Sequence, residues 1–186
     1  MCMEGGKEMK EYIPIEMGGF NYKGIRLRHE WQAMVTISEI LKEFDPELII
    51  EFGSQYGGLT LFMNDTCPNA EIRAYDIDNR YFHDVKKQLN DNVIFKVCNI
   101  LIGLPKDIVN LCRDKRRKFL YCDNGNKIHE VNTYAPFLNP GDMIGCHDWG
   151  IEIKEEDIEK VLRNFKPVKH DIFHENGWRS RFWKKI

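Results

Sequence analysis

The feature that most constrains the fold is the run Leu48-Ile49-Ile50-Glu51-Phe52, which is almost wholly apolar and is closed by Gly53. A strand with one solvated face would alternate apolar and polar residues, whereas this run carries apolar residues on both of its faces. Strands covered on both faces are typical of parallel sheets that have helices packed above and below them. The run therefore predicts a buried strand in an α/β domain.

Strand-like and helix-like segments alternate along the rest of the chain, as they do in repeated βαβ units. We expect an α/β fold with a Rossmann-like, doubly wound, mostly parallel sheet. The turn-like pair Asn176-Gly177 separates two late strand candidates, which predicts a C-terminal antiparallel hairpin strand. Strands are predicted over 48–52, 71–77, 93–97, 118–122, 143–146, 168–174 and 179–185, and helices over 28–44, 59–67, 78–90, 104–113, 127–138 and 153–164.

The length of 186 residues suits one domain whose core needs neither a disulfide nor a metal. Residues 1–24 are irregular and carry several glycines, so we expect a flexible N-terminal arm followed by a single domain over residues 25–186. The six cysteines include no Cys-x-x-Cys pair, so neither a zinc knuckle nor a redox motif is visible.

Composition excludes several classes of partner. The formal net charge of -2 argues against a general nucleic-acid binder, which is usually strongly basic. No run approaches the roughly 20 apolar residues of a membrane span. The first ten residues contain no apolar stretch of the kind found in signal peptides. We therefore expect a cytoplasmic protein that binds neither nucleic acid nor membrane. Its Trp-bearing C-terminal strands are a candidate homodimer edge.

A glycine-rich turn follows the first buried strand, in the sequence Glu51-Phe52-Gly53-Ser54-Gln55-Tyr56-Gly57-Gly58. Glycines let the backbone turn sharply and approach a ligand closely, and the next helix presents free N–H groups to that ligand. A dinucleotide fingerprint would read Gly-x-Gly-x-x-Gly, whereas here an acid precedes the first glycine. A carboxylate there would repel a pyrophosphate and tolerate a cationic or amine-bearing ligand.

Asp76 ends the next predicted strand, about twenty residues beyond the glycines, where an acid accepts hydrogen bonds from ribose hydroxyls. Asp78 follows two residues later and is suited to cap the helix predicted after it. The two roles are compatible, with Asp76 as the ribose ligand and Asp78 as the cap.

Glu51-Phe52-Gly53-Ser54 with Gly57-Gly58, followed by Asp76, resembles motif I and the next acidic motif of class I S-adenosylmethionine (SAM)-dependent methyltransferases. The segments 123–129, 140–142 and 146–149 are similar to those of small O-methyltransferases, of the catechol O-methyltransferase-like and cephalosporin-hydroxylase-like kinds. The resemblance covers most of the chain. It implies that residues 25–186 form a SAM-binding methyltransferase domain that methylates a hydroxyl of a small molecule, either a phenol or a sugar.

The resemblance also implies roles for single residues. Asp76 would hold the ribose, and Ile77 would lie against the adenine. Asn99 and Ile100 would approach the adenine edge, although many relatives carry an acid where Asn99 stands. Asp123 would lie beside the methyl group. The methionine end of SAM would be lined by Glu51, Gly53, Ser54, Tyr56 and Gly57.

Metal-dependent relatives hold Mg²⁺ with carboxylates at the ends of the fourth and fifth strands, and Asp123 and Asp148 match these positions. His147 stands where a further oxygen ligand is expected, and Mg²⁺ prefers oxygen whereas imidazole suits zinc, iron or manganese. Two alternatives remain open. Either Asp123 and Asp148 hold a divalent metal of another kind, or there is no metal and His147 is a general base. Asp123, His147 and Asp148 are the predicted catalytic residues.

Two other functions stay open at this point. A nicotinamide-dependent oxidoreductase is disfavoured by the glycine spacing and by Glu51. A non-catalytic SAM-fold domain that serves a partner is compatible with the short chain and with the departures at Asn99 and His147. If the chain is an enzyme, the arm 1–24 with Tyr12, Phe20 and Tyr22 would fold over the pocket and exclude water.

Overall fold

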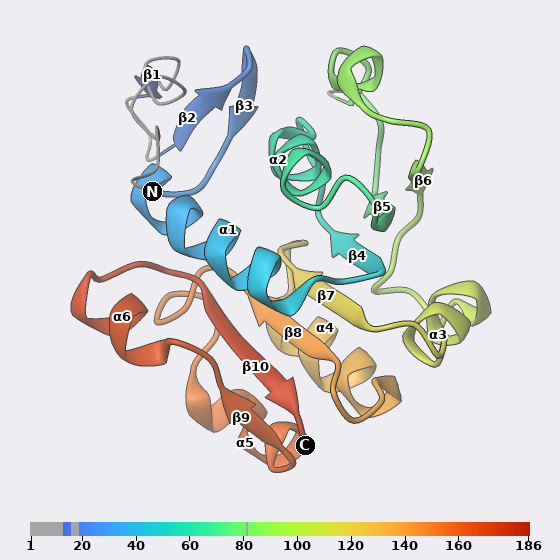
Figure 1. Ribbon diagram of the computed structural model, residues 1–186. Coiled ribbons are helices and arrows are strands. Elements are labelled where there is room, and N and C mark those ends of the chain that lie inside the picture. Colours follow the sequence, from blue (N-terminus) through green and yellow to red (C-terminus); the bar gives the residue numbers. More distant parts are fainter. Residues whose placement is uncertain (1–12, 16–18, 81) are drawn as a thin grey trace.

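The computed structural model describes residues 13–15, 19–80 and 82–186. These residues form a seven-stranded sheet with helices on both of its faces, and a separate three-stranded sheet (Figure 1). The strand order of the large sheet is β6-β5-β4-β7-β8-β10-β9. Among the described helices, none is long and apolar enough to cross a membrane.

Five neighbouring strands of the large sheet run parallel, and they are β6 (Val93–Val97), β5 (Glu71–Asp76), β4 (Leu48–Phe52), β7 (Lys118–Cys122) and β8 (Met143–Cys146). Strand β10 (Arg181–Lys185) pairs antiparallel with β8, and β9 (Phe165–Pro167) pairs antiparallel with β10. The predicted Rossmann-like, mostly parallel sheet with C-terminal antiparallel strands is confirmed.

Strand β4 lies between β5 and β7 and is buried at all five positions, which explains its apolar sequence. Its side chains alternate between two core clusters. Ile49 packs with α1 (Trp31–Phe44), α2 (Gly58–Thr66) and α6 (His170–Glu175) on one face. Leu48 and Ile50 pack on the other face with α3 (Lys106–Cys112), α4 (Lys127–Tyr134) and α5 (Glu155–Leu162). A short 3-10 helix, η3 (Ala135–Phe137), extends α4.

Two predicted elements are wrong. In the segment 78–90, predicted as a helix, the described residues contain one helical turn, the 3-10 turn η2 (Val85–Gln88). Its start is a tight turn, because the Asp78 carboxylate accepts the nearby Arg80 N–H at 2.9 Å and caps no helix. The segment 168–174, predicted as a strand, becomes α6. The antiparallel pairing of β9 with β10 ends at Pro167, and Phe173 then turns into the core.

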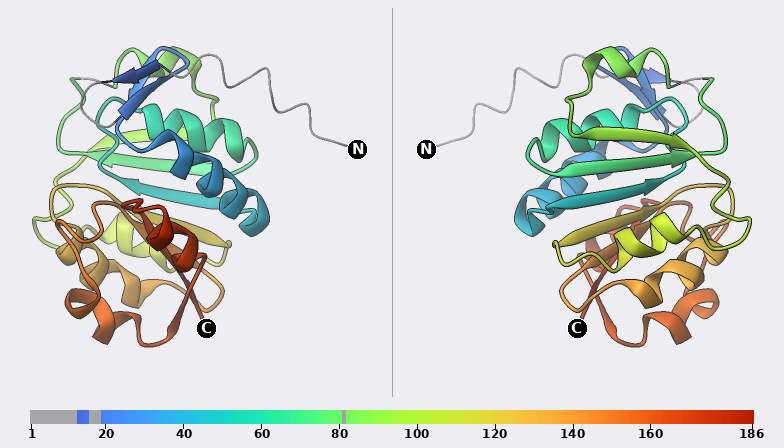
Figure 2. Two further views of the ribbon diagram at one scale, coloured as in Figure 1. Left: turned by 90° about the vertical axis from the view of Figure 1, so that its left-hand side faces the viewer. Right: turned by 90° about the vertical axis from the view of Figure 1, so that its right-hand side faces the viewer.

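Part of the predicted flexible arm is packed structure. Strands β1 (Ile13–Ile15), β2 (Gly19–Tyr22) and β3 (Ile25–Leu27) form the small antiparallel sheet, which lies beside α2 (Figure 2). Phe20 is buried in the core, and Tyr22 donates a hydrogen bond to Asp65 on α2 at 2.8 Å. The rest of the predicted arm, 1–12 with Tyr12 and 16–18, lies outside the described residues.

Candidate functional site

A cavity of about 690 Å³ opens at the carboxyl ends of β4, β5, β7 and β8, the edge where ligands bind in open α/β folds. Gly53, Gln55 and Asp76 line one end of it. Asp123, His147 and Asp148 line the other. The structure therefore brings together the three predicted catalytic residues and three of the predicted cofactor residues, Asp123 having been predicted in both roles. The remaining lining residues are Arg28, Glu30, Asn124, Gly125, Lys127, Glu152 and Arg179.

Gly53 allows β4 and β7 to approach each other at the floor of the cavity. Its φ is +88°, and a Cβ atom there would lie 2.2 Å from the Asp123 carbonyl oxygen. Its N–H donates to the Tyr75 carbonyl at 2.8 Å, so the turn is fixed between two strand ends. Gly57, also at positive φ, directly precedes α2, and its missing Cβ leaves room for the Val85 side chain. These contacts explain the glycines as a tight, ligand-accessible turn.

Glu51 lies behind this turn and is fully buried, outside the cavity lining. Its Oε2 accepts hydrogen bonds from Thr60 at 2.5 Å and Ser54 at 3.4 Å, while its Oε1 has no hydrogen-bond partner among the described residues. Burial, with the charges of Asp123 and Asp76, raises the pKa of Glu51 to about 8 against these hydrogen bonds. Glu51 therefore influences the cavity indirectly, because it holds Ser54 of the turn and Thr60 of α2.

Asp76, the predicted ribose ligand, faces the cavity with unused acceptor capacity. Its Oδ2 accepts the Gln55 N–H at 2.7 Å, and among the described residues its Oδ1 has only a 3.4 Å contact with the Asp78 N–H. A carboxylate oxygen has two lone pairs, so Oδ1 is able to accept ribose hydroxyls. Together with the open glycine turn, Asp76 fits the nucleoside part of SAM.

Several predicted cofactor residues do not line the cavity. Ile100 is buried in the core, and its carbonyl accepts the Tyr134 hydroxyl at 3.0 Å. The Asn99 side chain accepts the Leu101 N–H at 3.0 Å and so shapes its own turn. Ile77 is 58% exposed beside Asp76. Ser54, Tyr56 and Gly57 contribute to the turn and its packing.

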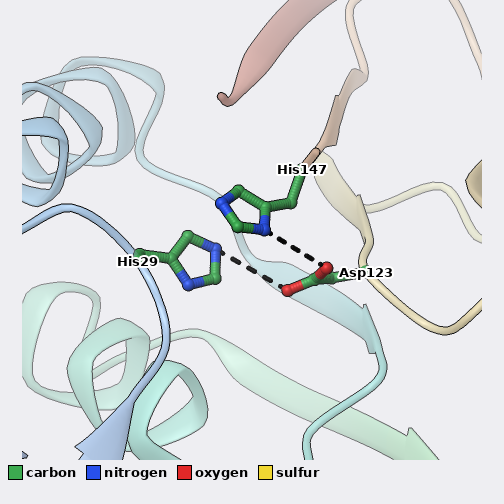
Figure 3. Close-up of side chains that lie close together, drawn as sticks. All are labelled: His29, Asp123 and His147. Carbon is green, nitrogen blue, oxygen red and sulfur yellow. Dashed lines mark ion pairs between the residues drawn. The ribbon is translucent and has the colours of Figure 1, made fainter. Parts of the chain in front are cut away.

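Two imidazoles converge on Asp123 at the other end of the cavity (Figure 3). His147 Nδ1 lies 3.5 Å from Asp123 Oδ1, and His29 Nε2 lies 3.7 Å from Asp123 Oδ2. The two rings stack with centroids 4.1 Å apart. Tyr121 also contacts the cluster, because its hydroxyl lies 2.9 Å from His29 Nε2 and 3.2 Å from Ser180 Oγ.

The surroundings give the two histidines different protonation states. Burial, helped by the neighbouring His147, lowers the pKa of His29 to about 3, so this ring is neutral. Burial also acts against the charged form of His147, but the carboxylates of Asp123, Glu30 and Asp148 outweigh it and raise the pKa to about 10. His147 is therefore protonated at neutral pH, which does not suit the predicted role of general base.

Lys127 links the cluster to two further acids. Its ammonium lies 2.9 Å from Asp148, 3.4 Å from Asp123 and 2.8 Å from Glu152. Although burial acts against its charge, these three carboxylates raise its pKa above the ordinary value. Glu130, buried on α4, accepts the N–H groups of Asn124 and Asn126 at 3.2 Å and so shapes the loop after Asp123.

Comparison with known proteins agrees with this geometry. A family model described as Rhamnosyl O-methyltransferase/CmcI matches residues 17–168. The chain belongs to this family. Rhamnosyl O-methyltransferases of Mycobacterium tuberculosis and Mycobacterium bovis are 25% identical to it over 181 residues, which cover 86% of this chain and 74% of each relative.

Two solved structures share the fold of this O-methyltransferase. An apo structure of CmcI matches with a TM-score of 0.67 at 12% identity, covering 89% of this chain and 76% of that chain. A SAM-dependent O-methyltransferase from Thermotoga maritima matches with a TM-score of 0.60 at 15% identity, covering 84% of this chain and 66% of that chain. The prediction of a class I SAM-dependent O-methyltransferase is confirmed. The oxidoreductase and non-catalytic alternatives find no support in these matches.

The carboxylates predicted to hold a divalent metal in this O-methyltransferase do not fit one. Asp123 and Asp148 both lie within ion-pair distance of the Lys127 ammonium, and both also face His147. A hard divalent ion needs several free oxygen ligands, which this pair does not offer. A different set, His29, Asp123 and His147, has ligand atoms within 4.8 Å of one another, close enough to share one metal ion, and its imidazoles suit a transition metal.

Several residues of the O-methyltransferase site carried no clear signal in the sequence. His29 and Glu30 fall inside the predicted helix 28–44, but α1 begins only at Trp31; Glu30 lines the cavity, and His29 contacts Asp123. Lys127 stands four residues after Asp123 at a helix start, and that spacing was its only available signal. Trp149 and Trp178 lie outside the cavity lining and pack against Trp183 and Phe173.

Proposed function

We propose that this O-methyltransferase methylates a hydroxyl of a sugar or of a similarly polar small molecule. The observation that carries the proposal is the lining of the cavity. Eight of its residues are Asp, Glu, Lys or Arg, and the described lining contains no aliphatic side chain and no Phe, Tyr or Trp. A phenol ring would need apolar walls, whereas a sugar offers several hydroxyls to charged and polar partners. The rhamnosyl group named for the mycobacterial relatives belongs to this polar class.

The cofactor would lie at the Gly53, Gln55 and Asp76 end, with its ribose hydroxyls donating to Asp76. SAM supplies a methyl group that its sulfonium already activates. The chain therefore has to align the acceptor oxygen with that methyl group and take up one proton.

Asp123 is the proton acceptor that this arrangement supports, in place of the predicted His147. Its carboxylate lies at the end of β7 on the cavity wall, between the cofactor end and the acceptor end. A hydroxyl becomes strongly acidic as its oxygen gains a methyl group, so a carboxylate is basic enough to accept its proton. Protonated His147 would fix the Asp123 carboxylate through the 3.5 Å contact with its Nδ1.

Calorimetric titration with S-adenosylhomocysteine (SAH) tests the cofactor end. We expect micromolar binding to the wild type and a loss of affinity of about 10- to 100-fold in Asp76→Ala, since hydrogen bonds to a charged group contribute about 1.5–3 kcal/mol. Asp78→Ala is the matched control, because Asp78 bonds only to its own turn with Arg80, and its affinity should match the wild type. Equal SAH affinity in Asp76→Ala and the wild type would contradict the ribose role.

Transfer of radiolabelled methyl from SAM tests the acceptor. The wild type is incubated separately with methyl rhamnoside, other monosaccharide glycosides and catechol. We expect label in the sugars, and none in a sample of Asp123→Asn. Label in catechol alone would show that the polar lining does not select the acceptor class, and the sugar proposal would be wrong.

A further inference from the structure

We propose that the ammonium group of Lys127 takes the place of a divalent cation between Asp123, Asp148 and Glu152, so that this enzyme works without a bound divalent metal. The inference rests on the proposed function, because it concerns the acceptor end of the same cavity. It assigns to Lys127 the role of a positioning residue, which fixes the carboxylates and supplies a permanent positive charge.

The geometry around the ammonium group is that of a filled cation site. Lys127 is 5% exposed, and its Nζ lies 2.8 to 3.4 Å from carboxylate oxygens of Glu152, Asp148 and Asp123. The ammonium group donates hydrogen bonds to Asp148 and Glu152, and Asp123 lies within ion-pair distance as the third carboxylate around it. The three acids come from different parts of the chain, at the end of β7, at the end of β8 and in the loop before α5. Such convergence on one nitrogen brings those segments to a common centre.

Every carboxylate oxygen of the two aspartates already lies near a positively charged or nitrogen-bearing side chain. Asp148 Oδ2 contacts Lys127, and Asp148 Oδ1 lies 3.5 Å from His147 Nδ1. Asp123 Oδ1 lies 3.4 Å from Lys127 and 3.5 Å from His147, and Asp123 Oδ2 lies 3.7 Å from His29. Each of the four oxygens therefore faces a nitrogen of the chain. A metal bound there would have to displace Lys127 or lie within a few ångströms of its charge, which Coulomb repulsion disfavours.

The histidine set is the competing cation site. His29, Asp123 and His147 would suit zinc, iron or manganese better than magnesium. Asp123 belongs to both sets, however, and is already in contact with Lys127. The Nε2 atom that His29 directs at Asp123 also lies 2.9 Å from the Tyr121 hydroxyl. We therefore assign the cation of this site to Lys127, and the experiment includes zinc to test the histidine set.

The decisive experiment is calorimetric titration of MnCl₂ and, separately, ZnCl₂ into the EDTA-treated wild type, Lys127→Ala and Lys127→Arg. We expect no saturable Mn²⁺ or Zn²⁺ binding below millimolar concentration to the wild type. Lys127→Ala exposes three carboxylates to one space, and we expect it to bind Mn²⁺ at least tenfold more tightly and to gain thermal stability with the metal. Lys127→Arg is the matched control, because it keeps the positive charge and should behave as the wild type does.

Micromolar Mn²⁺ or Zn²⁺ binding to the wild type would overturn the inference. So would a folded Lys127→Ala variant whose Mn²⁺ affinity equals that of the wild type. If Lys127→Ala fails to fold, the titrations of the wild type and of Lys127→Arg still decide, since both must lack metal binding. SAH titration of the same wild-type samples, with and without EDTA, separates this inference from the proposed function. Loss of SAH binding in both conditions would count against the methyltransferase site, whereas SAH binding that requires metal would count against Lys127 as its replacement.

Discussion

Glu51 makes the stability of the fold depend on pH, and substitution of this one residue removes that dependence. The carboxyl is fully buried, and its pKa is raised from 4.5 to about 8 in the folded chain. Above pH 4.5 the unfolded chain releases this proton while the folded chain keeps it. Stability contributed by Glu51 is therefore fully present below pH 4.5, falls as the pH rises, and levels off above pH 8.

The magnitude follows from the two pKa values. Between pH 5.5 and pH 7.5 the loss approaches 1.4 kcal/mol for each pH unit and totals about 2.5 kcal/mol. Glu51→Gln has the same shape and no titration, and its amide oxygen is able to accept the bonds from Thr60 and Ser54. We therefore expect the difference in unfolding free energy between wild type and Glu51→Gln to shift by about 2.5 kcal/mol over this range, in favour of the variant at higher pH.

Urea denaturation followed by circular dichroism, at pH 5.5, 6.5 and 7.5 and constant ionic strength, measures this difference. Working with the difference removes the contribution of every other titrating group that both proteins share. Parallel pH profiles for the two proteins would refute the reasoning, because they would mean that Glu51 has the same pKa folded and unfolded.

Two further substitutions test the packing that carries the site. Gly53→Ala places a Cβ 2.2 Å from the Asp123 carbonyl at positive φ and should lower the unfolding free energy by about 3 kcal/mol, whereas Gly103→Ala, also at positive φ but with open space, should cost about 1 kcal/mol. Comparable losses in urea denaturation would contradict the clash. Lys118→Met breaks a buried ion pair with Asp142, at 2.7 Å, and should cost about 3–5 kcal/mol. Adding Asp142→Asn should recover part of that loss, and a double variant as unstable as the single one would show that the unpaired charge is not its cause.

Much of the sheet was predictable because a strand buried on both faces has a continuous apolar sequence. The run 48–52 is such a strand. The polar residues that follow each strand meet at one edge by the geometry of parallel sheets. The structure accordingly places Gly53, Asp76, Asp123 and Asp148 around one cavity. The loop 78–90 was mistaken for a helix, since local side-chain hydrogen bonds such as that of Asp78 compete with helix formation and leave no strong pattern.

The charge states of the site could not be predicted from the sequence. His147 reads as an ordinary imidazole until the fold surrounds it with carboxylates. Glu152, which completes the contacts of Lys127, lies in a loop twenty-five residues further along the chain, so nothing in the local sequence connects them. His29 was hidden because Glu30, the residue before α1, makes no side-chain cap that would have marked the helix start.

The contacts of Tyr121 have a consequence for how the enzyme folds during synthesis. Its hydroxyl reaches His29, ninety-two residues earlier, and Ser180, fifty-nine residues later, so the site joins the two ends of the folded domain. Contacts of such long sequence separation form late, because chain entropy must be lost before they contribute. On the ribosome, a nascent chain that has completed β8 but not β10 would hold the cofactor turn and an uncovered sheet edge. Strand β10 then covers the β8 edge, and Ser180, directly before it, completes the hydrogen bonds of Tyr121 beside the site.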